Sequence, residues 1–376
     1  MAGIYFHIPF CKQACHYCDF HFSTSLKYKE ELLLALKNEF IQRKNYIESS
    51  TIESIYFGGG SPSILKPSDI QTLIDSVHQF FDVASDAEIS LEANPDDLYS
   101  EKVKDFKNTD INRFSIGIQS FFDEDLKWMN RAHTSQEADA CIKRVQDAGF
   151  ENITCDLIYG FPLLTEDKWA QNIDTLVEFD VPHLSCYGMT VEPKTALAKF
   201  IKVGKTAPMS ETQAAKQFIQ LIKKLEENHY THYEISNFAK NNHFAQHNTN
   251  YWKGIPYLGI GPSAHSFNGS SRSWNISNNA LYIKKVRNRE KYWEEEQLSL
   301  YDRFNENIMT SLRTMWGVDL NTIKTKFGET YKNYLLKEAQ PFLAKKHLTS
   351  EKNTLKLTSK GKLLADYIAS ELFLIE

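Results

Sequence analysis

The sequence predicts an α/β protein: a partial, open-sided (βα)6 TIM-like barrel followed by a small winged-helix-like domain. Two observations predict it. Short apolar strands alternate with amphipathic helical stretches six times within residues 1–230, the pattern of βα units around a parallel sheet. Residues 301–376 contain helices followed by a hairpin instead. Because six units are fewer than the eight of a closed barrel, we expect the barrel to stay open.

Each predicted strand is a short run rich in apolar residues. The six strands lie near Ile4–Ile8, Ser54–Phe57, Glu88–Glu92, Arg113–Ile118, Asn152–Leu157 and His183–Tyr187. The helices lie near Tyr28–Ile47, Pro67–Phe81, Glu101–Lys107, Ser135–Ala148, Glu166–Phe179 and Ser210–Asn228. Pro67 suits a first helical turn, where its missing N–H costs little. Parallel barrels carry their chemistry at the carboxyl ends of the strands, so functional residues are expected there.

The remainder of the chain divides into two segments. Residues 231–300 are rich in Asn, Ser, Gly and aromatic residues and predict an irregular segment covering the open side of the barrel. In residues 301–376, the expected elements are helices near Ile308–Met315, Leu320–Phe327 and Tyr331–Phe342, a hairpin over Leu348–Leu357 and a helix from Ser359. Residues 302–376 hold 12 Lys and Arg against 9 Asp and Glu, too small an excess for phosphate binding. We expect a packing or partner surface, and no nucleic acid.

Composition narrows the class of protein. With 376 residues, 42% of them hydrophobic, the chain can bury a large core, and its net charge of −5 does not indicate a nucleic-acid binder. No apolar run approaches the length of a membrane span. Isolated cysteines and the absence of a recognisable targeting segment predict the cytoplasm.

Three cysteines, Cys11, Cys15 and Cys18, form a C-x3-C-x2-C motif after the first strand. Three thiolates on one loop can hold three irons of a [4Fe–4S] cluster, since soft sulfur ligands suit such clusters. The fourth iron is then open to the amino and carboxylate groups of S-adenosylmethionine (SAM), whose sulfonium an electron from the cluster can cleave. The motif resembles the signature of the radical-SAM family.

The alternatives are a structural zinc site, a disulfide pair and three buried thiols. Zinc usually takes four ligands, and no second C-x2-C pair is present. Disulfides are disfavoured because no signal peptide is recognisable. The other cysteines stand alone in predicted helices or strands: Cys141, Cys155 and Cys186.

Polar or glycine residues follow the other predicted strands as well. Gly58-Gly59-Gly60-Ser61-Pro62 lets backbone approach a ligand closely, although such a run can also be a tight turn. Glu92, Gln119 and Asp156 could bond an amine and ribose hydroxyls, and Arg131 could meet a carboxylate through two N–H groups. Taken singly, each could be a solvated loop residue or a helix cap.

Four motifs together resemble the oxygen-independent coproporphyrinogen III oxidase family over nearly the whole chain. They are His7-Ile8-Pro9-Phe10-Cys11, Gly58-Gly59-Gly60-Ser61-Pro62, Ser115-Ile116-Gly117-Ile118-Gln119-Ser120 and Asp156-Leu157-Ile158-Tyr159-Gly160-Phe161-Pro162. By position, the resemblance implies SAM contacts at Tyr5, Tyr17, Gly59, Gly60, Ser61, Glu92, Gln119, Arg131, Asp156 and Gly188.

Two branches of that family differ in features that can be sought here. The authentic oxidases carry a long N-terminal extension and a further cysteine two residues after the third; here the motif starts at residue 11 and Phe20 takes that position. His247-Asn248-Thr249-Asn250-Tyr251-Trp252 resembles the H-N-x-x-Y-W motif of the HemW-type heme chaperones. The resemblance implies His247 as a heme-iron ligand, with Tyr251 and Trp252 against the porphyrin. A solvated turn histidine with two core aromatics is the alternative, and His243 and His265 are second-choice ligands.

The resemblance therefore implies a cytoplasmic heme chaperone. It would bind a [4Fe–4S] cluster, SAM and one heme, and pass the heme to a heme-requiring acceptor protein. Whether that acceptor is membrane-associated, whether the chain forms a homodimer and whether it is an enzyme stay open, and no catalytic residue is assigned. The alternative is an oxygen-independent coproporphyrinogen III dehydrogenase of porphyrin biosynthesis. A third interpretation is a radical-SAM enzyme acting on another substrate.

Overall fold

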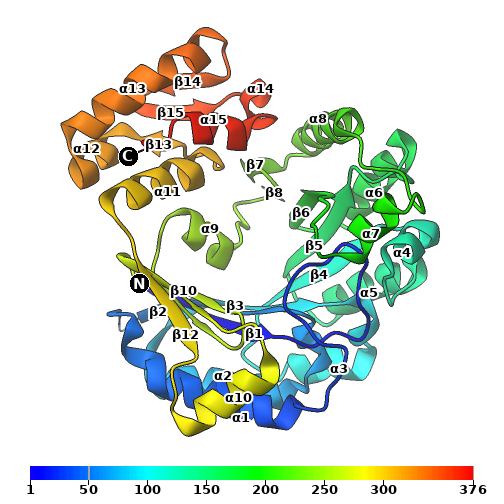
Figure 1. Cartoon of the computed structure of the whole chain (residues 1–376). Helices are drawn as coiled ribbons and strands as arrows, with labels where there is room; N and C mark the ends of the chain where they lie inside the picture. The colour runs from blue at the N-terminus through cyan, green and yellow to red at the C-terminus, as the bar shows by residue number, and fades with distance from the viewer. Residues whose placement is uncertain (50, 376) are drawn as a thin grey trace.

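The six predicted strands form a parallel sheet in the computed structural model, which describes residues 1–49 and 51–375 (Figure 1). They are neighbours in chain order, β1-β2-β3-β4-β5-β6, so all their carboxyl ends lie at one edge. Their bounds are β1 Ala2–Ile8, β2 Thr51–Gly59, β3 Asp82–Ala93, β4 Arg113–Gln119, β5 Asn152–Tyr159 and β6 His183–Gly188.

Helices connect these strands, and the six predicted ones are confirmed: α1 Lys29–Arg43, α2 Pro67–His78, α3 Ser100–Phe106, α5 Ser135–Asp147, α6 Glu166–Glu178 and α8 Glu211–Glu227. Two short helices were not predicted, α4 Asp123–Met129 and α7 Ala196–Lys202. Several begin at side chains that satisfy free backbone N–H groups: Thr134, Thr165 and Ser210 each accept the N–H three residues on. The apolar faces of the six predicted helices pack on the sheet and build one large core.

The prediction of an irregular segment over residues 231–300 is wrong. The segment adds strands to both ends of the parallel sheet, giving the order β12-β11-β10-β9-β1-β2-β3-β4-β5-β6-β8-β7. β12 and β7 have one neighbour each, so the 12-stranded sheet remains open. The added elements are β7 Thr231–Glu234, β8 Asn237–Ala239, α9 Gln246–Trp252, β9 Tyr257–Ile260, β10 His265–Phe267, β11 Ser271–Asn275, α10 Asn279–Asn288 and β12 Trp293–Gln297.

The strands of this segment were not predicted because its composition is polar. Ser273 and Asn275 of β11 are buried, which their residue types do not suggest. Asn275 donates to Glu39 of α1 at 2.6 Å, and Arg43 donates to Ser273 at 2.6 Å. Hydrogen bonds to residues distant in sequence thus stabilise these buried polar strands. Strand propensity, which depends only on local sequence, could not predict them.

Helix α9 lies between the sheet and the C-terminal elements (Figure 1). Its first backbone N–H groups, from Gln246 and His247, donate to the Glu88 carboxylate on β3 at 2.9 and 3.0 Å. A carboxylate at a helix N-terminus satisfies free donors and complements the helix dipole. Glu88 therefore fixes where α9 meets the sheet.

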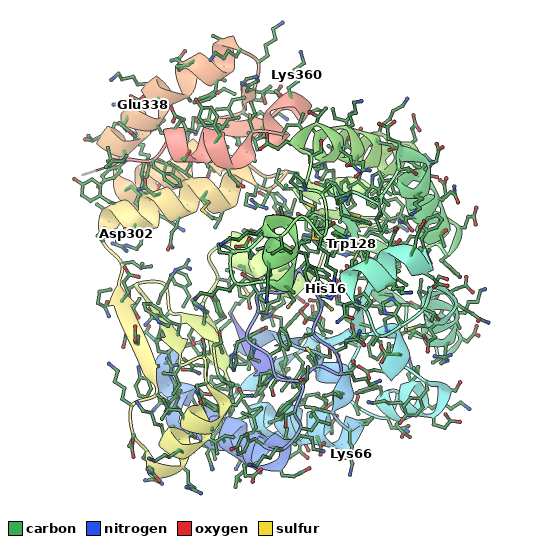
Figure 2. The ribbon with its side chains drawn as sticks, turned by 45° about the vertical axis from the view of Figure 1, so that its right-hand side comes forward. His16, Lys66, Trp128, Asp302, Glu338 and Lys360 are labelled. Carbon is green, nitrogen blue, oxygen red and sulfur yellow. The ribbon has the colours of Figure 1, made fainter. Side chains whose placement is uncertain are left out.

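The C-terminal residues form a winged-helix-like arrangement with its own apolar cluster, as the hairpin and helices predicted. Asp302, Glu338 and Lys360 mark three of its helices in Figure 2. Its first helix begins earlier than predicted, at Leu300, and the last one is split in two. The elements are α11 Leu300–Leu312, β13 Val318–Asp319, α12 Leu320–Phe327, α13 Glu329–Ala344, β14 Leu348–Glu351, β15 Thr354–Leu357, α14 Ser359–Lys362 and α15 Ala365–Glu371.

Arg313 joins these C-terminal elements to the edge of the sheet. Its guanidinium pairs with Glu234 of β7 at 3.3 Å and with Asp366 of α15 at 2.8 Å. Backbone bonds from Ile235 to Arg313 and from Met315 to Tyr233 continue the contact. Within the described residues, no helix has both the length and the apolarity needed to span a membrane.

Candidate functional site

The cysteine loop is anchored on two sides. Backbone N–H groups of Gly60 and Ser61 donate to Ile8 and Phe10 at 2.9 and 2.6 Å, which tie the loop after β1 to the loop after β2. On the other side, His16 bonds the carbonyls of Trp128 and Met129 at 2.8 and 3.0 Å, and Figure 2 shows His16 beside Trp128. The loop is thereby fixed before any ligand binds.

A cavity of about 450 Å³, the cysteine cavity, opens beside this loop. Twelve of the predicted residues line it: Cys11, Cys15, Cys18, Tyr17, Gly59, Gly60, Ser61, Glu92, Gln119, Arg131, Asp156 and Gly188. They come from five strand ends and two loops, which only the parallel sheet brings together. Tyr5, predicted among them, lies elsewhere.

Sequence reasoning missed several lining residues, among them Asn94, Ser115, Ile158 and Tyr187. Asn94 and Tyr187 stand two and one positions from predicted site residues, so extending each strand-end motif by two residues would have found them. Ser115 and Ile158 lie inside strands, and only their alternation toward the inner face could have indicated them.

All three loop cysteines are free and partly exposed. Burial, and secondarily the neighbouring thiols, raises the pKa of Cys18 to about 12, and burial raises that of Cys11 to about 11. Bound iron would supply the positive charge that thiolates need here. Across the described residues, no three His, Cys, Asp or Glu side chains meet closely enough to hold a single metal ion. A cubane takes one cysteine per iron, so thiols spread along one cavity wall fit it.

Glu92 and Asp156 present two carboxyl groups to the cavity. The Tyr56 hydroxyl and the Gly59 N–H donate to Glu92 at 2.9 and 3.1 Å. Burial raises the pKa of Glu92 to about 7; burial, and then the charge of Glu92, does the same for Asp156. A ligand with positive charge would favour the ionised forms of both.

Arg131 is held so that part of its guanidinium stays unpaired. One terminal nitrogen donates to the side chain of Asn94 and to the carbonyl of Gly117 at 2.7 Å, and the other lies 3.6 Å from the sulfur of Cys15. Its Nε is buried without a hydrogen-bond partner among the described residues. An unpaired buried donor is unfavourable, so a carboxylate ligand would stabilise this arrangement.

Backbone geometry at two positions accounts for the glycine motif. Gly59 has φ of +110°, and a Cβ there would lie 2.6 Å from the ring of His7. A Cβ on Gly60 would lie 2.6 Å from the carbonyl oxygen of Phe10. Both positions therefore require glycine, and the bare backbone forms part of the cavity wall. Gln119, at the end of β4, has φ of +68°, a strained conformation common at functional sites.

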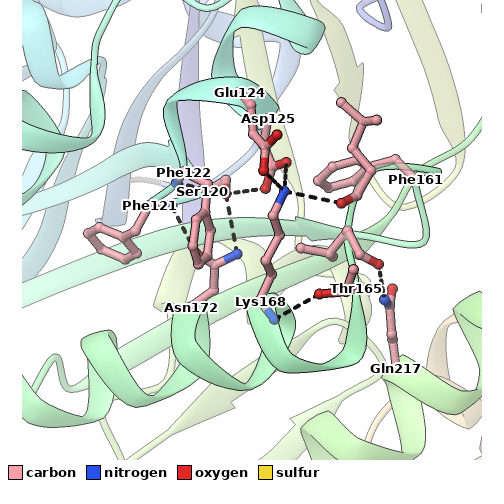
Figure 3. Close-up of polar contacts among 12 residues, drawn as sticks. Ser120, Phe121, Phe122, Glu124, Asp125, Phe161, Thr165, Lys168, Asn172 and Gln217 are labelled. Atoms are coloured by element: carbon pink, nitrogen blue, oxygen red, sulfur yellow. Dashed lines mark hydrogen bonds and ion pairs between the residues drawn. The ribbon is translucent and has the colours of Figure 1, made fainter.

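A polar network outside the cavity fixes the loops after β4 and β5 (Figure 3). Lys168 donates to Asp125 at 3.0 Å, and Ser120, next to Gln119, donates to the same carboxylate at 2.8 Å. On the following loop, the Gly160 N–H donates to Gln217 at 2.8 Å. The network explains how a strained strand end is held in place.

The three predicted heme contacts of the H-N-x-x-Y-W motif, His247, Tyr251 and Trp252, lie in different surroundings. His247 is 1% exposed, and its Nδ1 and Nε2 bond the hydroxyls of Ser54 at 2.8 Å and Tyr251 at 2.7 Å. Trp252 lies beneath the guanidinium of Arg313, 5.3 Å from the ring centre. Burial lowers the pKa of His247 to about 3, so the ring is neutral. In this conformation both ring nitrogens of His247 already have partners.

Tyr251 lines a second cavity of about 490 Å³, the histidine cavity, together with the displaced Tyr5. Three histidines and several aromatic rings form most of its wall. The full lining is Tyr5, His7, Asp19, Phe20, His21, Gly59, Glu92, Tyr251, Tyr257, Ser263 and His265. Asp19, Phe20, Gly59 and Glu92 line both cavities, so the two adjoin.

Comparison with known proteins agrees with this geometry. Residues 5–176 match the Radical SAM superfamily, and residues 298–364 match the HemN C-terminal domain. A protein of Bacillus subtilis named heme chaperone HemW is 31% identical over 98% of both chains. The chain belongs to the HemW family. The predicted family resemblance is thereby confirmed.

Other relatives support the same HemW assignment. The heme chaperone HemW of Mycobacterium tuberculosis is 31% identical over 98% of this chain and 94% of its own length. The solved structure of coproporphyrinogen III oxidase (HemN) from Escherichia coli has a TM-score of 0.86 with this HemW-family chain, covering 99% of it and 90% of the other, at 23% identity. That likeness establishes the fold: a radical-SAM α/β barrel with a C-terminal domain, as predicted.

Proposed function

We propose that this HemW-family protein is a heme chaperone that holds a [4Fe–4S] cluster and SAM in the cysteine cavity, binds one heme and passes it to a heme-requiring acceptor protein. The observation that carries the proposal is similarity over 98% of the chain to proteins named heme chaperone HemW. In keeping with its free cysteines, we propose that it acts in the cytoplasm.

Side chains of the cysteine cavity match the chemistry of the proposed cofactors. Cys11, Cys15 and Cys18 would ligate three irons. The guanidinium of Arg131 suits the carboxylate of SAM, and Glu92 and Asp156 suit its amine, sulfonium or ribose hydroxyls. Bound together, these cofactors would supply one-electron chemistry, while the residues themselves orient the ligand and balance its charge.

Heme binding is supported by the H-N-x-x-Y-W motif and by the aromatic second cavity. Its test is an anaerobic titration of cluster-reconstituted protein with heme, followed through the Soret band, and then mixing with an apo-form heme protein. We expect binding of one heme per chain and a Soret shift as heme moves to the acceptor. Binding no tighter than that of a heme-indifferent carrier protein would contradict the proposal.

Porphyrinogen oxidation is separated from this function by an assay with coproporphyrinogen III, SAM and a reductant. The expected result is no turnover, since the chain carries Phe20 where the oxidases carry a further cysteine. Conversion to the divinyl product over many turnovers would show a dehydrogenase instead. SAM cleavage with neither heme binding nor porphyrin turnover would show a radical-SAM enzyme with another substrate.

A further inference from the structure

The structure contains one aromatic cavity beside the cluster loop, and it has the size of a ligand site. Its volume of about 490 Å³ lies within the range of about 300–1,000 Å³ typical of small-molecule pockets. Tyr251 and Tyr257 meet edge-to-face in its wall, with ring centres 4.6 Å apart. Such a wall suits a flat, apolar macrocycle.

Of the three histidines around this cavity, His7 has both ring nitrogens in hydrogen bonds and His21 has one. His7 is 5% exposed, and its ring nitrogens contact the Tyr5 hydroxyl at 3.2 Å and the carbonyl of His21 at 3.0 Å. His21 bonds the side chain of Asn279 through Nε2 at 2.7 Å. Iron ligation by His7 would require these contacts to break.

His265 differs from both. It is exposed, and among the described residues neither of its ring nitrogens has a hydrogen-bond partner. It stands on β10 opposite Trp274 of β11, and the two rings stack with centres 6.3 Å apart and planes 29° apart. The imidazole is therefore held in place with its nitrogens free.

We infer that heme binds in the histidine cavity with His265 as an axial ligand of the iron. The inference rests on the proposed function and assigns its site. A free imidazole is a common axial ligand, and the tyrosine wall supplies the apolar contact. Because four residues line both cavities, heme at this site would lie beside the cluster and SAM.

His247 then receives a different role from the one its motif implies. Its Nε2 bonds the Tyr251 hydroxyl at 2.7 Å, and its Nδ1 anchors the pair to Ser54 of β2 at 2.8 Å. It would act through Tyr251, as a positioning residue that holds one aromatic ring in the cavity wall. In this role, His247 stabilises bound heme without touching iron.

The test is anaerobic heme titration of cluster-reconstituted protein, read through Kd, the Soret band and the magnetic circular dichroism of the iron. We expect His265→Ala to weaken binding by about tenfold or more and to remove the imidazole signature, and added imidazole to restore that signature. His247→Gln should weaken binding less and keep the signature. His243→Ala, outside the cavity on the loop before α9, serves as the matched control.

Outcomes separate this inference from the function on which it rests. Failure of the unmodified protein to bind heme would contradict both. Normal heme binding with an unchanged spectrum in His265→Ala would overturn the assignment alone, and loss of the imidazole signature in His247→Gln would give the ligand role to His247. Iron content and thermal unfolding of each variant show that it is folded.

Discussion

The two adjoining cavities use their polar groups in opposite ways. In the cysteine cavity, three free thiols and two carboxyl groups line the wall together with Arg131, whose buried Nε has no hydrogen-bond partner among the described residues. In the histidine cavity, His7 and Tyr251 are bonded to protein groups, whereas the ring nitrogens of His265 have no partner among the described residues. Unpaired buried groups are unfavourable until a ligand binds. The first cavity should therefore select ligands by charge, and the second by aromatic surface and one imidazole.

Removing a cluster thiol should have the largest effect and tests whether the two cavities are independent. We expect Cys15→Ser to lose most of the reconstituted iron and sulfide, since three thiolates must share the cluster. Heme binding in the adjoining cavity should persist within a few-fold. Cys141→Ala, a buried cysteine in α5, is the control and should keep its iron. Loss of heme binding together with the cluster would show that the two cavities do not bind their ligands independently.

Replacing Arg131 should have the next largest effect, and it should change ligand binding in the cysteine cavity only. Replacing it with Gln removes the donors offered to a carboxylate, and we expect SAM affinity to fall by about tenfold or more. Arg131→Lys should recover only part of it, because an ammonium lacks the planar fork. Equilibrium dialysis with labelled SAM measures both. Equal SAM affinity in all three proteins would remove Arg131 from the site.

SAM affinity should also depend on pH. Since burial raises the pKa of Glu92 and Asp156 to about 7, the folded protein without ligand holds protons that the unfolded chain releases near pH 4. These carboxyl groups therefore reduce stability as pH rises from about 4 to 7, and the loss is complete above that window. A cationic ligand favours ionisation, so SAM should bind more tightly as pH rises toward 7, by up to about tenfold per pH unit for each proton released, and this gain should level off above pH 7.

Glu92→Gln isolates the contribution of the protein to this dependence. The amine of the ligand titrates near pH 8 in its own right, and it does so equally for both proteins. The difference between their affinity profiles from pH 6 to 8 thus reports Glu92 and its coupling to Asp156. Superimposable profiles would show that Glu92 is already ionised, or does not face the ligand.

The contrast between the cavities also explains what the sequence could predict. Glu92, Gln119 and Asp156 lie in the carboxyl-terminal halves of β3, β4 and β5, and the parallel order of the strands brings them to one edge. Tyr5 lines the adjoining histidine cavity instead, because residues of one strand can face different sides or depths, which a motif match does not resolve. The histidine cavity could not be predicted, because it forms where β1 meets residues 251–265, whose strands depend on buried partners distant in sequence.

Tyr251→Phe should give a smaller effect that sharpens the description of the second cavity. The change keeps the ring but leaves Nε2 of buried His247 without its partner at 2.7 Å. We expect stability to fall by about 1–2 kcal/mol. Heme affinity should fall by only a few-fold, since the aromatic surface remains. Denaturant unfolding and heme titration measure the two, and a loss of heme binding as large as that of His265→Ala would point to the hydroxyl as a ligand.

Phe20 should show the smallest effect on stability and the most informative one on the boundary between the cavities. Its side chain is 68% exposed, yet it lines both cavities. Because an exposed ring contributes little to folding, Phe20→Ala should change stability by less than about 0.5 kcal/mol. Heme affinity should fall by about threefold as one aromatic contact is lost, and Phe20→Leu should recover part of it. If Phe20→Ala instead weakens SAM binding and leaves heme affinity unchanged, the ring belongs to the cysteine cavity alone.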